Sequence, residues 1–147
     1  MFEGSHSVTM DAKGRLAIPA KVRDQLTSVC QGRFVVTADV VERCLLVYPD
    51  THWPEVRASI QALPNTNRTA RKYQRLMVGM ATSLELDGNG RVLLPQTLRD
   101  YAFLEKKLIL VGQGSKLELW SDERWNAMIN AEDDEDELTE ELKNLSI

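Results

Sequence analysis

Four arginines stand at matching places in two stretches of the chain, and their chemistry suits binding to nucleic acid. An arginine carries a planar fork of donors that can grip a phosphate or the O6 and N7 edge of guanine. The four are Arg15, Arg23, Arg91 and Arg99. Lys13 and Lys21 add charge beside the first pair, where the second pair has Asn89 and Thr97. Because each neutralised phosphate contributes separately to salt-dependent affinity, the first stretch is the better suited of the two to bind a nucleic acid.

A predicted turn comes directly before the first arginine of each pair. The residues expected to structure these two turns are Asp11, Gly14, Asp87 and Gly90. Aspartate can accept hydrogen bonds from amides further along a turn, and glycine adopts a positive φ without steric cost. We therefore expect Arg15 and Arg91 at a rigid, exposed rim. The alternative for Arg15 is a surface arginine that pairs with Asp11 or Asp24.

The two stretches are copies of one sequence unit. Residues 7–24 read S-V-T-M-D-A-K-G-R-L-A-I-P-A-K-V-R-D, and residues 83–100 read S-L-E-L-D-G-N-G-R-V-L-L-P-Q-T-L-R-D. Apolar residues match apolar residues along the alignment. A repeated unit of this size cannot bury its apolar face alone, so we expect the two copies to share one core.

Each copy is predicted to begin with two strands and a short helix. Alternating apolar and polar residues predict strands at 7–10 and 15–18, joined as a hairpin with Leu16 and Ile18 facing inward. Pro19 suits the first position of a helix. Two further strands and a longer helix follow in each copy, at 34–37, 44–48 and from about 50, and at 108–111, 117–120 and from about 122.

These elements predict an α+β, β-rich fold in which two tandem repeats form one compact core with flanking helices. The expected units are a first repeat at 5–52, a helical connection at 53–80, a second repeat at 81–124, and a C-terminal helix with an acidic tail at 125–147. An amphipathic helix is predicted at 67–81, with Arg68, Arg71, Lys72 and Arg75 on its polar face. The sequence leaves open whether this face is merely solvated or contacts an anion or a partner.

The net charge of −4 hides two unlike regions. Residues 132–147 hold eight acidic residues against one lysine, while residues 1–131 hold 17 Lys and Arg against 14 Asp and Glu, a net charge of +3. The body of the protein is therefore mildly basic. We expect the acidic tail to be solvated and partly disordered, with competition against nucleic acid for a basic surface as the alternative.

Few residues could support catalysis or hold a metal. His6 and His52 have no Cys or carboxylate at ligand spacing, and no nucleophile elbow or phosphate-binding loop occurs. Cys30 and Cys44 are too few for a disulfide framework or a zinc site, and we expect buried thiols. No apolar run approaches the roughly 20 residues of a membrane helix, and no signal segment is evident. We expect a cytoplasmic protein without metal, cofactor or enzymatic activity.

The repeated pattern D-x-x-G-R-[apolar]-x-[apolar]-P-x-x-[apolar]-R resembles the motif of the AbrB/SpoVT/MazE superfamily of swapped-hairpin DNA-binding proteins. Its doubling within one chain resembles the MraZ family in particular. Further likenesses are Met1-Phe2 with Gly4, L-L-V-Y-P at 45–49, L-V-G-Q at 110–113 and E-L-W at 118–120. The resemblance covers roughly residues 1–130, and two copies of the motif with these intervening segments make it highly specific.

This resemblance implies a bacterial transcriptional regulator that binds double-stranded DNA at the promoter of division and cell-wall genes, including its own, and associates with the nucleoid. It implies two double-split βαβ halves with swapped hairpins, and subunits assembled in a ring. It assigns DNA contact to Arg15 and Arg23 and to their copies Arg91 and Arg99. Some superfamily members have a further arginine where this chain has an aspartate. Contact by one copy is then weaker, and a ring would bind direct repeats through avidity.

The competing hypothesis is a protein-interaction module of the antitoxin type, in which the acidic tail and exposed tryptophans engage a partner. Trp53 and Trp125 have helical spacing to apolar neighbours, so we expect both in the core. An antitoxin would normally carry one copy of the motif and a long partner-binding tail. The doubled motif and the short tail favour the regulator.

Overall fold

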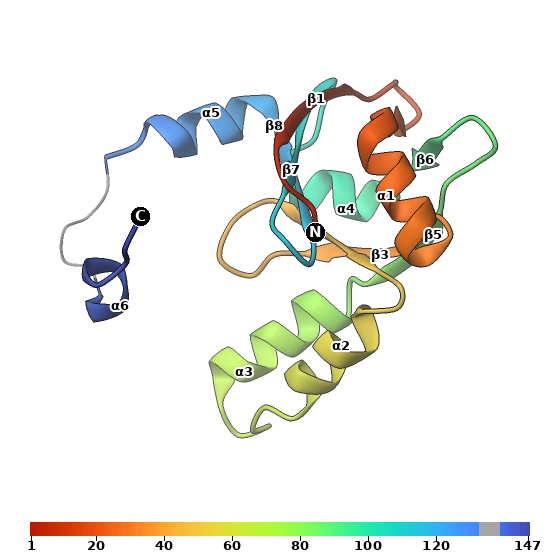
Figure 1. Cartoon of the computed structure of the whole chain (residues 1–147). Coiled ribbons are helices and arrows are strands. Elements are labelled where there is room, and N and C mark those ends of the chain that lie inside the picture. The colour runs from red at the N-terminus through yellow and green to blue at the C-terminus, as the bar shows by residue number, and fades with distance from the viewer. Residues whose placement is uncertain (133–138) are drawn as a thin grey trace.

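The computed structural model describes residues 1–132 and 139–147. Its core is built on two antiparallel sheets (Figure 1). The larger sheet has six strands in the order β1–β7–β8–β4–β3–β5, and the smaller one pairs β2 with β6. The strands are β1 (Ser5–Thr9), β2 (Arg15–Ala17), β3 (Arg33–Ala38), β4 (Leu45–Pro49), β5 (Thr82–Glu85), β6 (Arg91–Leu93), β7 (Lys107–Gly112) and β8 (Leu117–Ser121). Residues 133–138 of the acidic tail, which we expect to be solvated and partly disordered, lie outside the described part of the chain.

Helices follow the strands in each copy, as the sequence predicted. They are α1 (Ala20–Cys30), α2 (Trp53–Gln61), α3 (Arg68–Tyr73), the π-helical η1 (Gln74–Val78), α4 (Gln96–Tyr101), α5 (Asp122–Asn130) and α6 (Glu140–Lys143). Pro19 precedes α1 and Pro95 precedes α4, since proline has no amide that needs an intrahelical partner. The predicted α+β, β-rich fold with two repeats is confirmed.

The two copies exchange strands. β1 of the first copy pairs along its length with β7 of the second, and β5 of the second pairs with β3 of the first. The predicted hairpin between 7–10 and 15–18 is therefore wrong, because within the described residues only a bridge between Met10 and Leu16 joins these strands. An isolated hairpin leaves much of its apolar face in water. The exchange instead sets Val8 opposite Leu108 and buries both in a shared core.

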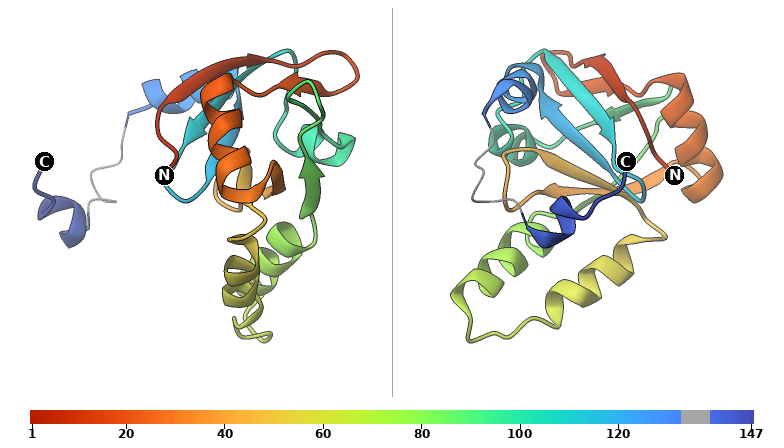
Figure 2. Two further views of the ribbon diagram at one scale, coloured as in Figure 1. Left: turned by 45° about the vertical axis from the view of Figure 1, so that its right-hand side comes forward. Right: turned by 60° about the vertical axis from the view of Figure 1, so that its left-hand side comes forward.

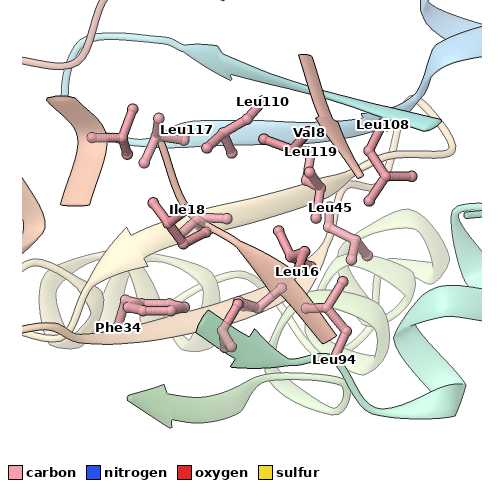
Figure 3. Close-up of a cluster of buried hydrophobic side chains, with 14 of the residues drawn as sticks. Val8, Leu16, Ile18, Phe34, Leu45, Leu94, Leu108, Leu110, Leu117 and Leu119 are labelled. Carbon is pink, nitrogen blue, oxygen red and sulfur yellow. The ribbon is translucent and has the colours of Figure 1, made fainter. Parts of the chain in front are cut away.

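The main core lies between the large sheet and the β2–β6 pair (Figure 3). Leu16 and Ile18 of the first copy and Val92 and Leu94 of the second are all less than a tenth exposed. Burial of each such side chain contributes about 1.5–3 kcal/mol relative to exposure. Since equivalent positions of both copies meet here, the expectation of one shared core is confirmed.

The outer face of the large sheet is covered by two separate groups of helices. α2, α3 and η1 pack on β3 and β4, and α5 packs on β7 and β8. Both views of Figure 2 show α2 and α3 projecting from the side of the sheet that is remote from β1. Trp53 packs on Tyr48 with ring centroids 5.5 Å apart, and Trp125 packs on Trp120 at 5.7 Å. Trp53 is buried as expected, whereas Trp125 is only half-buried.

The predicted helix at 67–81 is present as α3 continued by η1, over residues 68–78. η1 forms a wider, π-helical turn, in which the amide of Gly79 donates to the carbonyl of Gln74 at 3.2 Å. A Cβ atom on Gly79 would collide with the carbonyl oxygen of Arg75. Glycine therefore permits this turn.

Candidate nucleic-acid interface

The turn before each motif arginine is organised by its aspartate. Asp11 Oδ1 accepts hydrogen bonds from the backbone amides of Lys13 at 3.0 Å and Arg15 at 2.9 Å. Asp87 Oδ1 accepts from the amide of Arg91 at 2.9 Å in the same way. The amide of the following arginine is the main cause that holds the pKa of each of these carboxyl groups below its ordinary value. Both turns are thus fixed while the aspartates are ionised.

The aspartates also orient the arginine side chains. Arg15 Nε donates to Asp11 Oδ2 at 3.0 Å, while Arg91 Nε lies 3.4 Å from Asp87 Oδ2 without the alignment of a hydrogen bond. The structure therefore contains the alternative pair of Arg15 with Asp11, and among the described residues it shows no ion pair of Arg15 with Asp24. The pair engages Nε alone. The outer nitrogens of Arg15 remain available to a ligand, since its side chain is 40% exposed.

Arg15 and Arg91 lie on one face of the β2–β6 ribbon. The central pair of the ribbon is Leu16 with Val92, and the flanking pairs are Arg15 with Leu93 and Ala17 with Arg91. Because the central pair is buried in the core and successive side chains alternate between faces, the flanking pairs face outward. Leu93 is 54% exposed there. It was not among the predicted site residues, although the alternation of its strand would have indicated its direction.

The helix arginines lie against the motif glycines of the opposite copy. Gly14 has φ +92° and Gly90 has φ +72°. A Cβ atom on Gly14 would lie 2.7 Å from Cζ of Arg99, and one on Gly90 would lie 2.6 Å from Cδ of Arg23. Each glycine is therefore required for its backbone conformation, and a side chain in its place would also displace the end of the opposing arginine. In addition, Arg99 Nε donates to the carbonyl of Leu94 at 3.0 Å.

Because the copies exchange strands, the predicted contact residues form two groups, which we call corners. The first corner joins Lys13 and Arg15 of the first copy to Arg99 of the second, and the second corner joins Arg91 to Arg23. Exposed Lys21 lies on α1 with Arg23. The sequence order had placed Arg15 with Arg23 and Arg91 with Arg99. All predicted cations reach the surface at least in part. The glycines that lie against Arg23 and Arg99 belong to the other copy.

The described residues contain no group of three His, Cys, Asp or Glu side chains that could hold a metal ion. Cys30 and Cys44 are buried free thiols, and burial is the main cause that raises the pKa of both. Within the same residues, no helix is both long enough and apolar enough to cross a membrane.

Comparison with known proteins gives the chain a family. A family model described as "MraZ protein, putative antitoxin-like" matches it twice, over residues 1–76 and 77–145. The chain belongs to the MraZ family. A protein of Saccharophagus degradans named "Transcriptional regulator MraZ" is 62% identical over 147 residues and 100% of both chains. Proteins of the same name from Marinobacter nauticus and Pseudomonas aeruginosa are 53% and 48% identical, over 99% and 90% of this chain and 98% and 87% of their own.

Membership of the MraZ family confirms the resemblance found in the sequence. The two matches of the family model also show which unit supplies each part of a corner. The first match contains the turn at 11–14, and the second contains Arg99, which lies against that turn. The converse holds for the turn at 87–90 and Arg23. Neither MraZ unit of this chain therefore builds a complete corner alone.

Proposed function

We propose that this chain is a transcriptional regulator that binds double-stranded DNA through the outer face of the β2–β6 ribbon. The observation that carries the proposal is the placement of Arg15 and Arg91 on one exposed face, each oriented by an aspartate. A two-stranded ribbon fits the major groove of B-DNA, where an arginine fork can pair with guanine. The name of the relatives, "Transcriptional regulator MraZ", supports the same role.

The remaining candidate cations contribute charge and position. Exposed Lys13 and Lys21 bind phosphates and add to the salt-dependent part of the affinity. Arg23 and Arg99 hold the opposite turns and present their outer atoms to the DNA backbone. The protein acts by binding alone, in the cytoplasm and in association with the nucleoid, with no enzymatic step, metal or cofactor.

The proposed target is a set of direct repeats in the promoter of the protein's own gene and of division and cell-wall genes. Each subunit offers one small ribbon, and a single ribbon makes a weak contact. Assembly of subunits into a ring makes every contact after the first intramolecular, which raises the overall affinity without new contacts. DNA with a single repeat should then bind poorly.

A salt titration of DNA binding tests this function. The wild type, Arg15→Ala and Arg91→Ala would be titrated with the DNA upstream of the protein's own gene and with a scrambled duplex. We expect a steep salt dependence, a preference for the upstream DNA, and a loss of roughly tenfold or more in affinity for Arg15→Ala. Arg91→Ala should cost less, because Lys13 supports the first turn and Asn89 stands in its place in the second.

Lys116→Ala is the matched control, since it removes one charge from the turn between β7 and β8 and should leave the preference intact. A wild type without preference for the upstream DNA at physiological salt would overturn the proposal and favour the antitoxin-type interaction module. A larger loss for Arg91→Ala than for Arg15→Ala would overturn the leading role of the first copy while leaving the DNA function in place.

A further inference from the structure

A second cationic surface lies on α3 and η1, far along the chain from the first corner. It consists of Arg68, Arg71, Lys72 and Arg75, which we call the basic face. All four side chains are exposed. They recur at i, i+3, i+4 and i+7 and so share one side of the helix, while Ala70 and the core residues of η1 are buried on the other.

In the part of the chain that the structure describes, the basic face has no acidic partner. None of its four side chains lies within 4.0 Å of a carboxylate among the described residues. Residues 53–81 hold five Lys and Arg and one acidic residue, a net charge of +4, although the whole chain has −4. A face that served only solubility would interleave both signs of charge. Four unopposed cations on one side of a helix instead suit a polyanion.

The helix that carries the basic face is fixed to the sheet. The fully buried Thr37 of β3 donates from Oγ1 to the carbonyl of Met77 at 2.6 Å. Gln74 Nε2 donates to the carbonyls of Ile60 at 3.3 Å and Leu63 at 3.2 Å, which ties η1 to the end of α2. Asn67 caps the other end of the helix by accepting from the amide of Ala70 at 3.1 Å. The cations therefore project from a rigid support.

We propose that the basic face binds the phosphate backbone of duplex DNA that flanks the site read by the ribbon. This inference rests on the proposed function. From residue 68 to residue 75 the helix rises about 10 Å, which matches roughly three successive phosphates of one strand. The contact is with the backbone and carries no base sequence.

The connection between the two surfaces supports a shared ligand. After η1 the chain runs through β5 directly into the turn at 87–90 of the second corner. The eight residues 79–86 span at most about 27 Å when extended. A flank of about ten base pairs therefore brings phosphates within reach of the basic face.

The test compares DNA with and without flanks. The full-length triple variant Arg68→Gln/Arg71→Gln/Arg75→Gln keeps good helix formers in place and removes three charges. Its matched control, Lys107→Gln/Lys116→Gln/Lys143→Gln, removes three charges elsewhere. Each protein is titrated with salt on a short duplex that holds only the repeats and on the same duplex extended by about 15 base pairs of unrelated sequence at each end. Circular dichroism and light scattering check folding and assembly.

We expect the wild type and the control to bind the extended duplex more tightly than the short one. The triple variant should lose that advantage, and its slope of log K against log salt on the extended duplex should fall by about 2 to 3, with little change on the short duplex. The inference would be overturned if the triple variant kept both the salt slope of the wild type and its tighter binding of the extended duplex. A wild type that binds the repeats no more tightly than unrelated DNA would overturn the proposed function instead.

Two other occupants of the basic face would show as separate outcomes. A triple variant that forms a smaller assembly with an unchanged salt slope would assign the face to contact between copies and overturn the inference. Removal of residues 132–147 tests the acidic tail. If removal strengthens binding of the extended duplex in the wild type but not in the triple variant, the tail competes for the face and the DNA contact is supported.

Discussion

The two corners resemble each other closely, whereas the two outer groups of helices do not. Both corners combine an aspartate-ordered turn, a motif glycine and an arginine from the opposite copy. The outer groups share an aromatic pair but differ otherwise: α2, α3 and η1 bury Trp53 and carry the basic face, whereas α5 buries Trp125 only in part and begins with acidic residues. Parts built jointly by both copies are held to one geometry. Parts that are built mainly by one copy are free to diverge in packing and charge.

The largest expected difference between the outer groups is in stability. Trp53→Ala should lower the free energy of unfolding by about 3–5 kcal/mol, as for a fully buried aromatic side chain. Trp125→Ala should cost less, because its side chain is only partly buried against Trp120. Urea unfolding followed by circular dichroism at one protein concentration measures both. Equal losses would mean that α5 is buried further in the assembled protein, so that the two outer groups would not differ in packing.

A smaller effect is expected at the corners, where the two copies should behave alike. Gly14→Ala and Gly90→Ala should each cost about 1–2 kcal/mol for the left-handed backbone, with a further loss from contact with the opposing arginine. Gly88→Ala is the control, since nothing lies within 4 Å of its Cβ position. In the Arg99→Ala background, Gly14→Ala should cost less than it does in the wild type. If the background makes no difference, the close packing of Gly14 and Arg99 contributes nothing to stability.

The sequence predicted the turns, the order of elements and the inward side chains, but not the partners of the strands. Alternation in the first strand places Val8 on the apolar side whichever strand it pairs with, so periodicity alone could not decide between a local hairpin and the exchange with β7. The same limit applies to the site. Arg23 is on the surface as predicted, yet its neighbour Gly90 lies in the other copy. Only the resemblance to swapped-hairpin proteins pointed to the exchange.

The smallest expected effect is a difference between the two corners in how their contribution to stability depends on pH. Folding lowers the pKa of Asp11 and Asp87, so the stability that their charge supplies is present above the unfolded pKa, near 4, and is lost as the pH falls through the folded value. Asparagine keeps an oxygen for the turn amides but loses the charge. Asp11→Asn should therefore be less stable than the wild type at pH 7, and the difference should shrink at pH 3.

The same substitution at Asp87 should have less effect, because Arg91 Nε lies 3.4 Å away without hydrogen-bond alignment, while Arg15 Nε donates to Asp11 at 3.0 Å. Urea unfolding at the two pH values measures both differences, with Asp122→Asn on the surface of α5 as the control for a lost charge. A difference that grows toward pH 3 would mean that the neutral carboxyl groups, not the ionised ones, hold the turns. Equal effects at Asp11 and Asp87 would show that the better alignment of Arg15 adds nothing to the stability of its turn.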